Sequence, residues 1–221
     1  MQKSVIIVAG GKGSRMKSDI PKQFLFIDGK PILMHTIEKF YQYENSINII
    51  LVLPENQMFY WQSLVKKQKF TIPLTIEKGG ETRFQSVKNG LEHINEGIVG
   101  IHDAVRPLVS LSTIKSAFAL AETEGNAVPV ISTNESIRII NDKANHHLDR
   151  NTIKIVQTPQ CFEAVLIKQA YKQDYKSIFT DDASVLENTG KSIYLSEGNS
   201  ENIKITTALE LKLAEILIKP D

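Results

Sequence analysis

Five short runs of β-branched and other apolar residues alternate along the chain with stretches whose apolar residues recur at helical spacing. Leu33, Ile37 and Phe40, for example, would share one face of a helix. This alternation predicts an α/β fold with a mostly parallel sheet and helices on both faces. Ligands of such sheets bind beyond the carboxyl ends of the strands. The predicted strands are Ser4–Val8, Asn48–Leu53, Leu74–Ile76, Ile98–His102 and Ala127–Ile131.

The alternation breaks between residues 136 and 157. Ser136–Asn141 and Ile153–Gln157 have the pattern of two strands, and the polar stretch Asp142–Asn151 joins them. This pattern predicts a β-hairpin arm that leaves the sheet. Because no internal repeat or linker interrupts the chain, we expect residues 1–221 to form one domain with an arm at about 135–157. After the arm we expect helices near Glu163–Gln173 and Asp181–Asn188, a strand at Ser192–Ser196 and a final helix from Thr207.

The composition argues against several classes of protein. The chain has 221 residues, with 26 Lys and Arg against 25 Asp and Glu, and a formal net charge of +1. Such a balance argues against a surface that follows a nucleic-acid backbone. The one cysteine, Cys161, excludes an intramolecular disulfide and a Cys-rich metal site. Because there is no run of about 18 apolar residues and no signal-peptide pattern after Met1, we expect a cytoplasmic protein without membrane contact.

A glycine-rich loop follows the first predicted strand. Gly10, Gly11 and Gly13 would let backbone N–H groups approach an anion without obstruction by a Cβ atom. Arg15 and Lys22 add two cations to the same region. The loop fits neither a Walker A motif nor a dinucleotide fingerprint, because Lys12 precedes Gly13 and position 16 is Met. The alternative is a plain connector with solvated cations.

This loop resembles the signature of nucleotidyltransferases that make activated sugars and sugar alcohols. Further segments resemble, in order and along the whole chain, the 2-C-methyl-D-erythritol 4-phosphate cytidylyltransferase family. The resemblance implies a single Rossmann-like nucleotidyltransferase domain over residues 1–221, with CTP as co-substrate and a sugar-alcohol phosphate as acceptor. It also implies a homodimer interlocked through the arm. It also implies a divalent metal, Mg²⁺, held mainly by the CTP phosphates. Because a carboxylate beside a triphosphate would repel it, we expect Asp103 to bind this metal, the ribose or the hydroxyl groups of the acceptor. The segments are Ala9–Met16 with Pro21–Gln23, Gly79–Val87, His102–Pro107, Asp149–Asn151 with Gln157–Gln160, Thr180–Ser184 and Asn202–Thr206.

In cytidylyl transfer, two anions react and negative charge builds around the α-phosphorus. The reaction therefore needs positioned cations more than a base, because the attacking phosphate is already ionised. The resemblance implies that Arg15 and Lys22 stabilise the transition state. Around the CTP it places Ala9, Gly10, Gly11, Gly13, Gly80, Glu81, Ser86 and Ala104. Many relatives have Asp where this chain has Glu81. The alternative for Ser86 is a structural position in the first turn of its helix, without a contact to CTP.

The acceptor site is expected from residues that are far apart in the sequence. Arg150 and Lys204 would hold the acceptor phosphate, and Asp103 and hydroxyl side chains would bind its alcohols. The alternatives are a structural Asp103–Arg106 pair, a helix cap at Thr180 and an ordinary surface role for Lys204. Relatives carry Asp-Thr-Ile-Lys where this chain has Glu135–Arg138. The residues expected to position the acceptor are Asp103, Arg106, Ser136, Arg150, Thr158, Thr180 and Lys204.

Other polar residues are expected to have structural roles. Arg83 would support the turn before its helix, His102 would be a structural histidine, and His146 and His147 would lie on the surface of the arm. Thr207 and Glu210 have the spacing of a capping box. Two other functions stay open at this point: a ribitol 5-phosphate cytidylyltransferase, and a catalytically silent nucleotide-sensing module. The presence of both Arg15 and Lys22 argues against the silent module.

Overall fold

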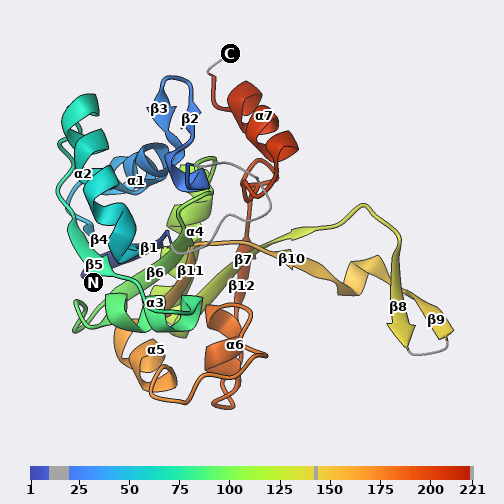
Figure 1. The fold of residues 1–221 in the computed structure, drawn as a ribbon. Coiled ribbons are helices and arrows are strands. Elements are labelled where there is room, and N and C mark those ends of the chain that lie inside the picture. The colour runs from blue at the N-terminus through green and yellow to red at the C-terminus, as the bar shows by residue number, and fades with distance from the viewer. Residues whose placement is uncertain (10–19, 142–143, 220–221) are drawn as a thin grey trace.

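The structure is a computed structural model that describes residues 1–9, 20–141 and 144–219. Within this part of the chain a central sheet of eight strands runs in the order β10-β7-β11-β6-β1-β4-β5, with β12 joined to β7 (Figure 1). The predicted strands are present with ends shifted by at most three residues. The strands of this sheet are β1 (Lys3–Val8), β4 (Asn48–Leu53), β5 (Thr75–Lys78), β6 (Ile98–Asp103), β7 (Asn126–Ser132), β10 (Lys154–Val156), β11 (Gln160–Glu163) and β12 (Leu195–Glu197).

The sheet is mostly parallel, as predicted. β1 pairs in parallel with β4 and β6, β4 with β5, and β7 with β12. β11 lies antiparallel between β6 and β7 and was not predicted, because its four residues are too short to carry a periodic signal. It directly follows Pro159, whose peptide bond with Thr158 is cis.

Helices cover both faces of the sheet, because alternate residues of its central strands point to opposite sides. Val5 and Ile7 pack with one set of helices, whereas Ile6 and Val8 pack with the other. Figure 1 shows the two layers on either side of the sheet. One layer contains α1 (Ile32–Tyr43), α2 (Glu55–Gln68) and α4 (Leu111–Glu124), and the other contains α3 (Arg83–Leu91), α5 (Ala164–Ala170) and α6 (Asp182–Glu187).

A smaller apolar cluster joins the C-terminal part of the chain to the domain. α7 (Ala208–Leu217) packs near the hairpin of β2 (Phe26–Ile27) and β3 (Lys30–Pro31). Buried Ala214 of α7 belongs to the same cluster as Ile27 and Ile205. The N–H of Ile205 also donates to the carbonyl of Val105 at 3.0 Å. These contacts bring the segment before α7 to the carboxyl end of β6.

The helix ends test two of the sequence expectations. α7 begins with the predicted capping box, in which Thr207 and Glu210 each accept from the other's backbone N–H. α6 has the same arrangement with Asp181 and Ser184. The alternative in which Thr180 caps α6 is therefore wrong, because the side chain of Asp181 accepts from the N–H of Ser184.

The arm is present, but its predicted strand pairing is wrong. β8 (Ile137–Asn141) pairs with β9 (Ala144–Leu148), and this hairpin extends away from the sheet (Figure 1). The segment Lys154–Val156 instead forms β10, which pairs with β7 in the main sheet. The polar residues of β9 gave no strand signal, because Asn and His are weak strand formers. His146 and His147 are exposed on this strand, as expected.

Among the described residues, no helix is both long enough and apolar enough to span a membrane.

Candidate active site

Asp103 lies at the carboxyl end of β6, where the sequence predicted a ligand site. One carboxylate oxygen, Oδ2, lies 3.0 Å from Nζ of Lys204 and 3.1 Å from Nε of Arg106. The other oxygen, Oδ1, lies 3.9 Å from Nε of Arg83. Three cations from separate segments therefore converge on one carboxylate. Two of them, Arg106 and Lys204, were predicted to be near Asp103, whereas Arg83 was expected only to support its own turn.

The three cations keep Asp103 ionised although it is buried. Burial raises the pKa of the Asp103 carboxyl, but the cations of Lys204, Arg83 and Arg106 outweigh this effect and hold the pKa well below its usual value. Arg106 is anchored further, because its Nη1 donates to the carbonyl of Asn202 at 2.6 Å. The side chain of Lys204 is 43% exposed, so it can also bind a ligand from solvent.

His102 and Thr158 hold the backbone of Asp103 in place. The Nε2–H of His102 donates to the carbonyl of Arg106 at 3.1 Å, which leaves Nδ1 to accept from the hydroxyl of Thr158 at 3.0 Å. The hydroxyl of Thr158 accepts in turn from the N–H of Asp103 at 3.2 Å. Burial lowers the pKa of His102 to about 4, so the ring is neutral. These contacts match the structural role expected for His102 and connect Thr158 to Asp103 through its backbone.

The turn before α3 is held by a short hydrogen-bonded network. The N–H of Gly80 donates to Oγ of Ser86 at 3.1 Å, and that hydroxyl donates to the carbonyl of Thr82 at 2.9 Å. Thr82 caps α3 through its side chain. A Cβ atom on Gly80 would overlap the side chain of Gln85, so this close turn requires glycine. Glu81 is exposed at the turn.

The backbone near the end of β1 is anchored on both sides of the glycine-rich loop. The N–H of Ala9 donates to Val52, and its carbonyl accepts from Nε2 of Gln23 at 3.0 Å. Gln23 was not assigned a role from the sequence, although it follows Lys22 in the Pro-Lys-Gln segment. Lys22 is half-buried and begins a 3₁₀ turn, Lys22–Phe24. Predicted residues Gly10, Gly11, Gly13 and Arg15 lie outside the described residues.

Ala104 also lies at this edge of the sheet. Its N–H donates to the carbonyl of Val8 at 3.1 Å, and its carbonyl accepts from the buried hydroxyl of Thr36 at 2.9 Å. Its backbone is therefore fixed between β1 and α1. This places Ala104 beside Ala9 in the fold, at the carboxyl ends of two neighbouring strands.

Three predicted acceptor residues are not brought to Asp103 by contacts among the described residues. Ser136 and Arg150 belong to the arm, which extends away from the sheet (Figure 1). The Nη1 of Arg150 donates to the carbonyl of Asn134 at 2.6 Å, within the base of the arm. Thr180 is exposed immediately before Asp181, the cap of α6.

One residue of this region was missed by the sequence analysis. Asp182, the first residue of α6, is fully buried and binds both terminal nitrogens of Arg83. Its segment, Thr180–Ser184, was noted for its resemblance, but two adjacent aspartates do not reveal which of them caps a helix and which one binds elsewhere. The signal in the sequence that could have pointed to Asp182 was the presence of a second aspartate beside the helix cap.

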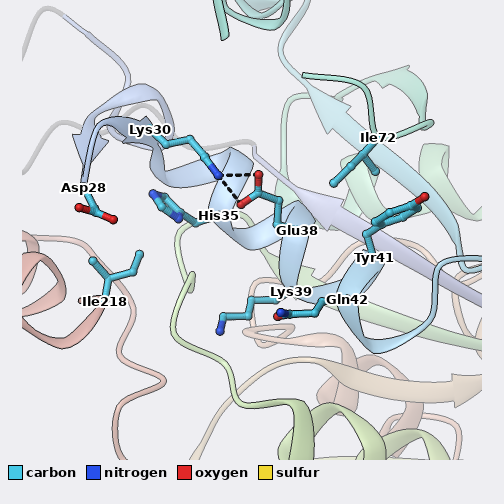
Figure 2. Close-up of a pocket in the computed structure, with 9 residues that line it drawn as sticks. All are labelled: Asp28, Lys30, His35, Glu38, Lys39, Tyr41, Gln42, Ile72 and Ile218. Carbon is cyan, nitrogen blue, oxygen red and sulfur yellow. Dashed lines mark hydrogen bonds and ion pairs between the residues drawn. The ribbon is translucent and has the colours of Figure 1, made fainter. Parts of the chain in front are cut away.

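A pocket of about 480 Å³ lies elsewhere, next to α1 and the β2–β3 hairpin (Figure 2). In it the ammonium group of Lys30 faces Glu38, with its Nζ 2.6 Å and 2.7 Å from the two carboxylate oxygens. Of the residues predicted for catalysis or substrate binding, none that the structure describes lines this pocket. Among the residues that the structure describes, no group of three or more His, Cys, Asp or Glu side chains could hold a metal ion.

Comparison with known proteins gives one consistent family. Residues 4–220 match the family described as IspD: 2-C-methyl-D-erythritol 4-phosphate cytidylyltransferase. Proteins of that name from Phocaeicola vulgatus and Bacteroides thetaiotaomicron are 52% and 50% identical to this chain, each over 99% of this chain and all of the relative.

Solved structures agree in fold. The protein of the same name from Francisella tularensis is 30% identical, with a TM-score of 0.79 over 98% of this chain and 100% of that one. The 4-diphosphocytidyl-2C-methyl-D-erythritol synthase from Anaerococcus prevotii superposes with a TM-score of 0.85 over 99% of this chain and 96% of that one. At 24% identity, this second likeness supports the α/β fold alone.

Proposed function

Because the chain belongs to the 2-C-methyl-D-erythritol 4-phosphate cytidylyltransferase family, we propose that the carboxyl edge of its sheet around Asp103 is the active site. The protein is a CTP-dependent cytidylyltransferase that joins CTP and 2-C-methyl-D-erythritol 4-phosphate. The products are 4-diphosphocytidyl-2-C-methyl-D-erythritol and pyrophosphate. The observation that carries the location of the site is the convergence of Arg83, Arg106 and Lys204 on Asp103.

The reaction forms one phosphorus–oxygen bond and breaks another. An ionised oxygen of the acceptor phosphate attacks the α-phosphorus of CTP, the bond from that phosphorus to the bridging oxygen breaks, and the electron pair leaves with pyrophosphate. No proton must be removed from the nucleophile. We assign to Lys22 and Arg15 the stabilisation of the charge that develops on the α-phosphoryl and bridging oxygens, because both follow the first strand with the glycine-rich loop.

The two substrates would lie on either side of Asp103. The turn of Gly80, Glu81 and Ser86 offers short-range donors and acceptors for the cytosine edge, while the backbones of Ala9 and Ala104 border the nucleotide. Lys204 and Arg106 would hold and orient the acceptor, and Asp103 would accept hydrogen bonds from its hydroxyl groups. Support comes from the chemistry of the set: an ionised carboxylate attracts hydroxyl donors, and the exposed ammonium group of Lys204 attracts a phosphate.

We also propose that Mg²⁺ takes part and is held mainly by the phosphates of CTP. The described residues fit this arrangement, because Asp103 is already surrounded by cations and no cluster of metal-binding side chains stands beside it. Mg²⁺ commonly keeps several waters. It binds through substrate phosphates and one or two carboxylates, rather than in a cage made only of protein ligands. When bound, it neutralises charge on the triphosphate.

A homodimer through the arm completes the proposal. Ile139 and Ile140 of β8 are 44% and 82% exposed, and Ile155 and Val156 of β10 are 46% and 42% exposed. Apolar side chains on an extended hairpin are a common mark of a protein interface. Ser136 and Arg150 would then serve the active site of the partner subunit, since the arm that carries them extends away from the sheet that carries Asp103 (Figure 1). Residues 1–221 would act as one nucleotidyltransferase domain in each subunit.

The experiment that tests the function compares two acceptors in parallel assays of pyrophosphate release with CTP and Mg²⁺. Ribitol 5-phosphate has a longer linear chain, so a site fitted to the branched tetritol would leave polar groups unpaired. Each such group costs about 1–3 kcal/mol, and two mismatches give a preference of roughly 10²-fold in kcat/KM for 2-C-methyl-D-erythritol 4-phosphate. A preference for ribitol 5-phosphate would overturn the acceptor assignment, and no turnover with either acceptor would favour a silent nucleotide-binding module.

A further inference from the structure

An ion pair between the partly exposed Arg83 and the buried Asp182 connects the turn before α3 to the start of α6. Nη1 of Arg83 lies 2.8 Å from Oδ1 of Asp182, and Nη2 lies 2.6 Å from Oδ2, so the two groups bind as a fork. The hydroxyl of Tyr171 also donates to Oδ1 of Asp182 at 2.6 Å. Asp182 is 0% exposed, and every polar atom of its carboxylate has a partner. The two segments are 99 residues apart in the sequence.

Asp182 is not needed to begin its own helix. The neighbouring Asp181 caps α6, with its side chain accepting from the N–H of Ser184 at 2.9 Å. Asp181 also accepts from Gln160 at 2.8 Å, and Gln160 accepts from the N–H of Ala183 at 2.8 Å. The start of α6 is therefore held without the Arg83 pair. Burying an ion pair is also a poor way to gain stability, because desolvation offsets the attraction.

Arg83 stands between two parts of the proposed active site. It is the first residue of α3 and directly follows Thr82. The carbonyl of Thr82 accepts a hydrogen bond from the hydroxyl of Ser86. The guanidinium group is planar and rigid, so fixing both terminal nitrogens on Asp182 also fixes the direction of Nε. That Nε lies 3.9 Å from Oδ1 of Asp103, while Oδ2 is left to Arg106 and Lys204.

We propose that Asp182 is a positioning residue that acts through Arg83. It fixes the turn expected to bind cytosine and also the Asp103 carboxylate of the acceptor site. In this way it couples the binding of the two substrates. This inference rests on the proposed location of the active site. Asp182 touches neither substrate. Its role is to hold the guanidinium group of Arg83 in a single orientation, between the turn at Gly80 and Asp103, which are the groups expected to contact the substrates.

Removal of the Asp182 charge has a specific consequence. Arg83 would lose its fork partner and would turn toward Asp103, the next carboxylate within 4 Å. There it would compete with Arg106 and Lys204 for the same group, which disturbs the acceptor site. The turn at Gly80 would lose its fixed distance from Asp103 at the same time. Binding of one substrate would then no longer favour binding of the other.

Three variants of the full-length protein separate this role from a general structural one. Asp182→Asn keeps the shape of the side chain but removes its charge, and Arg83→Lys keeps the cation but removes the fork. Tyr171→Phe is the matched control, because it removes a hydrogen bond from the same buried carboxylate and leaves the fork with Arg83 intact. Thermal unfolding of each variant sets an assay temperature at which all of them are folded.

The readout is the coupling between substrates at equilibrium. The Kd of 2-C-methyl-D-erythritol 4-phosphate is measured by calorimetry with and without saturating α,β-methylene-CTP, an analogue that cannot release pyrophosphate. We expect the analogue to tighten acceptor binding at least about 5-fold in the unmodified protein and in Tyr171→Phe. In Asp182→Asn and Arg83→Lys we expect the ratio to fall to within 2-fold of unity, and kcat/KM to fall about 10-fold or more.

The other outcomes are equally definite. Equal coupling in all four proteins, or equal loss in Tyr171→Phe and Asp182→Asn, overturns the positioning role and leaves the pair as part of the core. Absence of coupling in the unmodified protein overturns it as well. Failure of the unmodified protein to turn over CTP and acceptor would instead reject the proposed function, so the two failures are distinguishable.

Discussion

The ammonium group of Lys204 lies 3.0 Å from a carboxylate oxygen of Asp103, and this pair joins the segment before α7 to the end of β6. The side chain of Asp103 is 10% exposed and that of Lys204 is 43% exposed, so the pair has one buried and one accessible member. This asymmetry suits a site in which the carboxylate is fixed and the cation meets an incoming anion.

We expect Lys204→Gln to raise the KM for the acceptor by about 10- to 100-fold and to change the KM for CTP much less. A hydrogen bond to a charged group contributes roughly 1.5–3 kcal/mol, which corresponds to that range. Steady-state kinetics with each substrate varied in turn measures both constants. Lys212→Gln is the control, because Lys212 is exposed on α7. An acceptor KM within 3-fold of the unmodified value would remove Lys204 from the site.

We expect Lys22→Ala to lower kcat by about 10²-fold or more while CTP binding weakens less, because one pre-organised cation acts chiefly on the charge of the transition state. Turnover at saturating concentrations of both substrates and the Kd of CTP are the two measurements. Lys67→Ala, at an exposed position of α2, serves as the control. Near-normal turnover in Lys22→Ala would contradict the assignment of Lys22 to the transition state.

The buried His102 predicts how stability depends on pH. Its pKa is lowered from 6.5 to about 4 by burial, so between these values the unfolded chain binds a proton that the folded protein does not. The free energy of unfolding therefore falls as the pH falls through this window, by roughly 1.4 kcal/mol per pH unit for one proton. We expect His102→Gln to remove most of this slope.

Urea denaturation at intervals between pH 4.5 and 6.5 measures the slope. His146→Gln is the matched control, because His146 is exposed on the arm and its loss should leave the slope unchanged. The glutamine at position 102 can still donate to the carbonyl of Arg106, so the variant retains one of the two hydrogen bonds. An unaltered slope in His102→Gln would mean that another group carries the pH dependence.

The arm predicts a dimer that one charge can disrupt. Ile140 is 82% exposed in the single chain, and in the proposed dimer its side chain would be covered. Ile140→Asp would bury an unpaired charge, so we expect monomers at micromolar concentration in light scattering. Activity should fall with the loss of the dimer if Arg150 serves the partner subunit.

Val165→Asp is the control for this change, since Val165 is 62% exposed on α5, away from the arm. It should leave the molecular mass and the activity unchanged. A fully active monomer, either as the unmodified protein or as Ile140→Asp, would contradict both the dimer and the role of Arg150.

Much of the proposed active-site edge could be predicted because it depends on local order along the chain. A parallel strand ends where its apolar run ends, so Asp103 and Ala9 were both expected at the carboxyl edge. The turn of Gly80 was expected from its two glycines before a helix. The structure adds the hydrogen bond from the N–H of Gly80 to Oγ of Ser86, which explains the six-residue spacing between them. Four of the predicted residues lie outside the described part of the chain, so their positions stay predictions: Gly10, Gly11, Gly13 and Arg15.

The alternation of apolar runs by itself therefore determined that this chain forms a mostly parallel sheet with helices on both faces, and it predicts the proposed ligand edge near Asp103. Only the tertiary structure decided that Lys154–Val156 joins β7 rather than the arm, and that Arg83 binds Asp182. The physical reason is that periodicity reports which face of an element is buried, whereas the partner of a strand or of a charge depends on how distant segments meet. A carboxylate at position 181 or 182 looks the same in sequence, and the fold makes one a helix cap and the other a buried partner of Arg83.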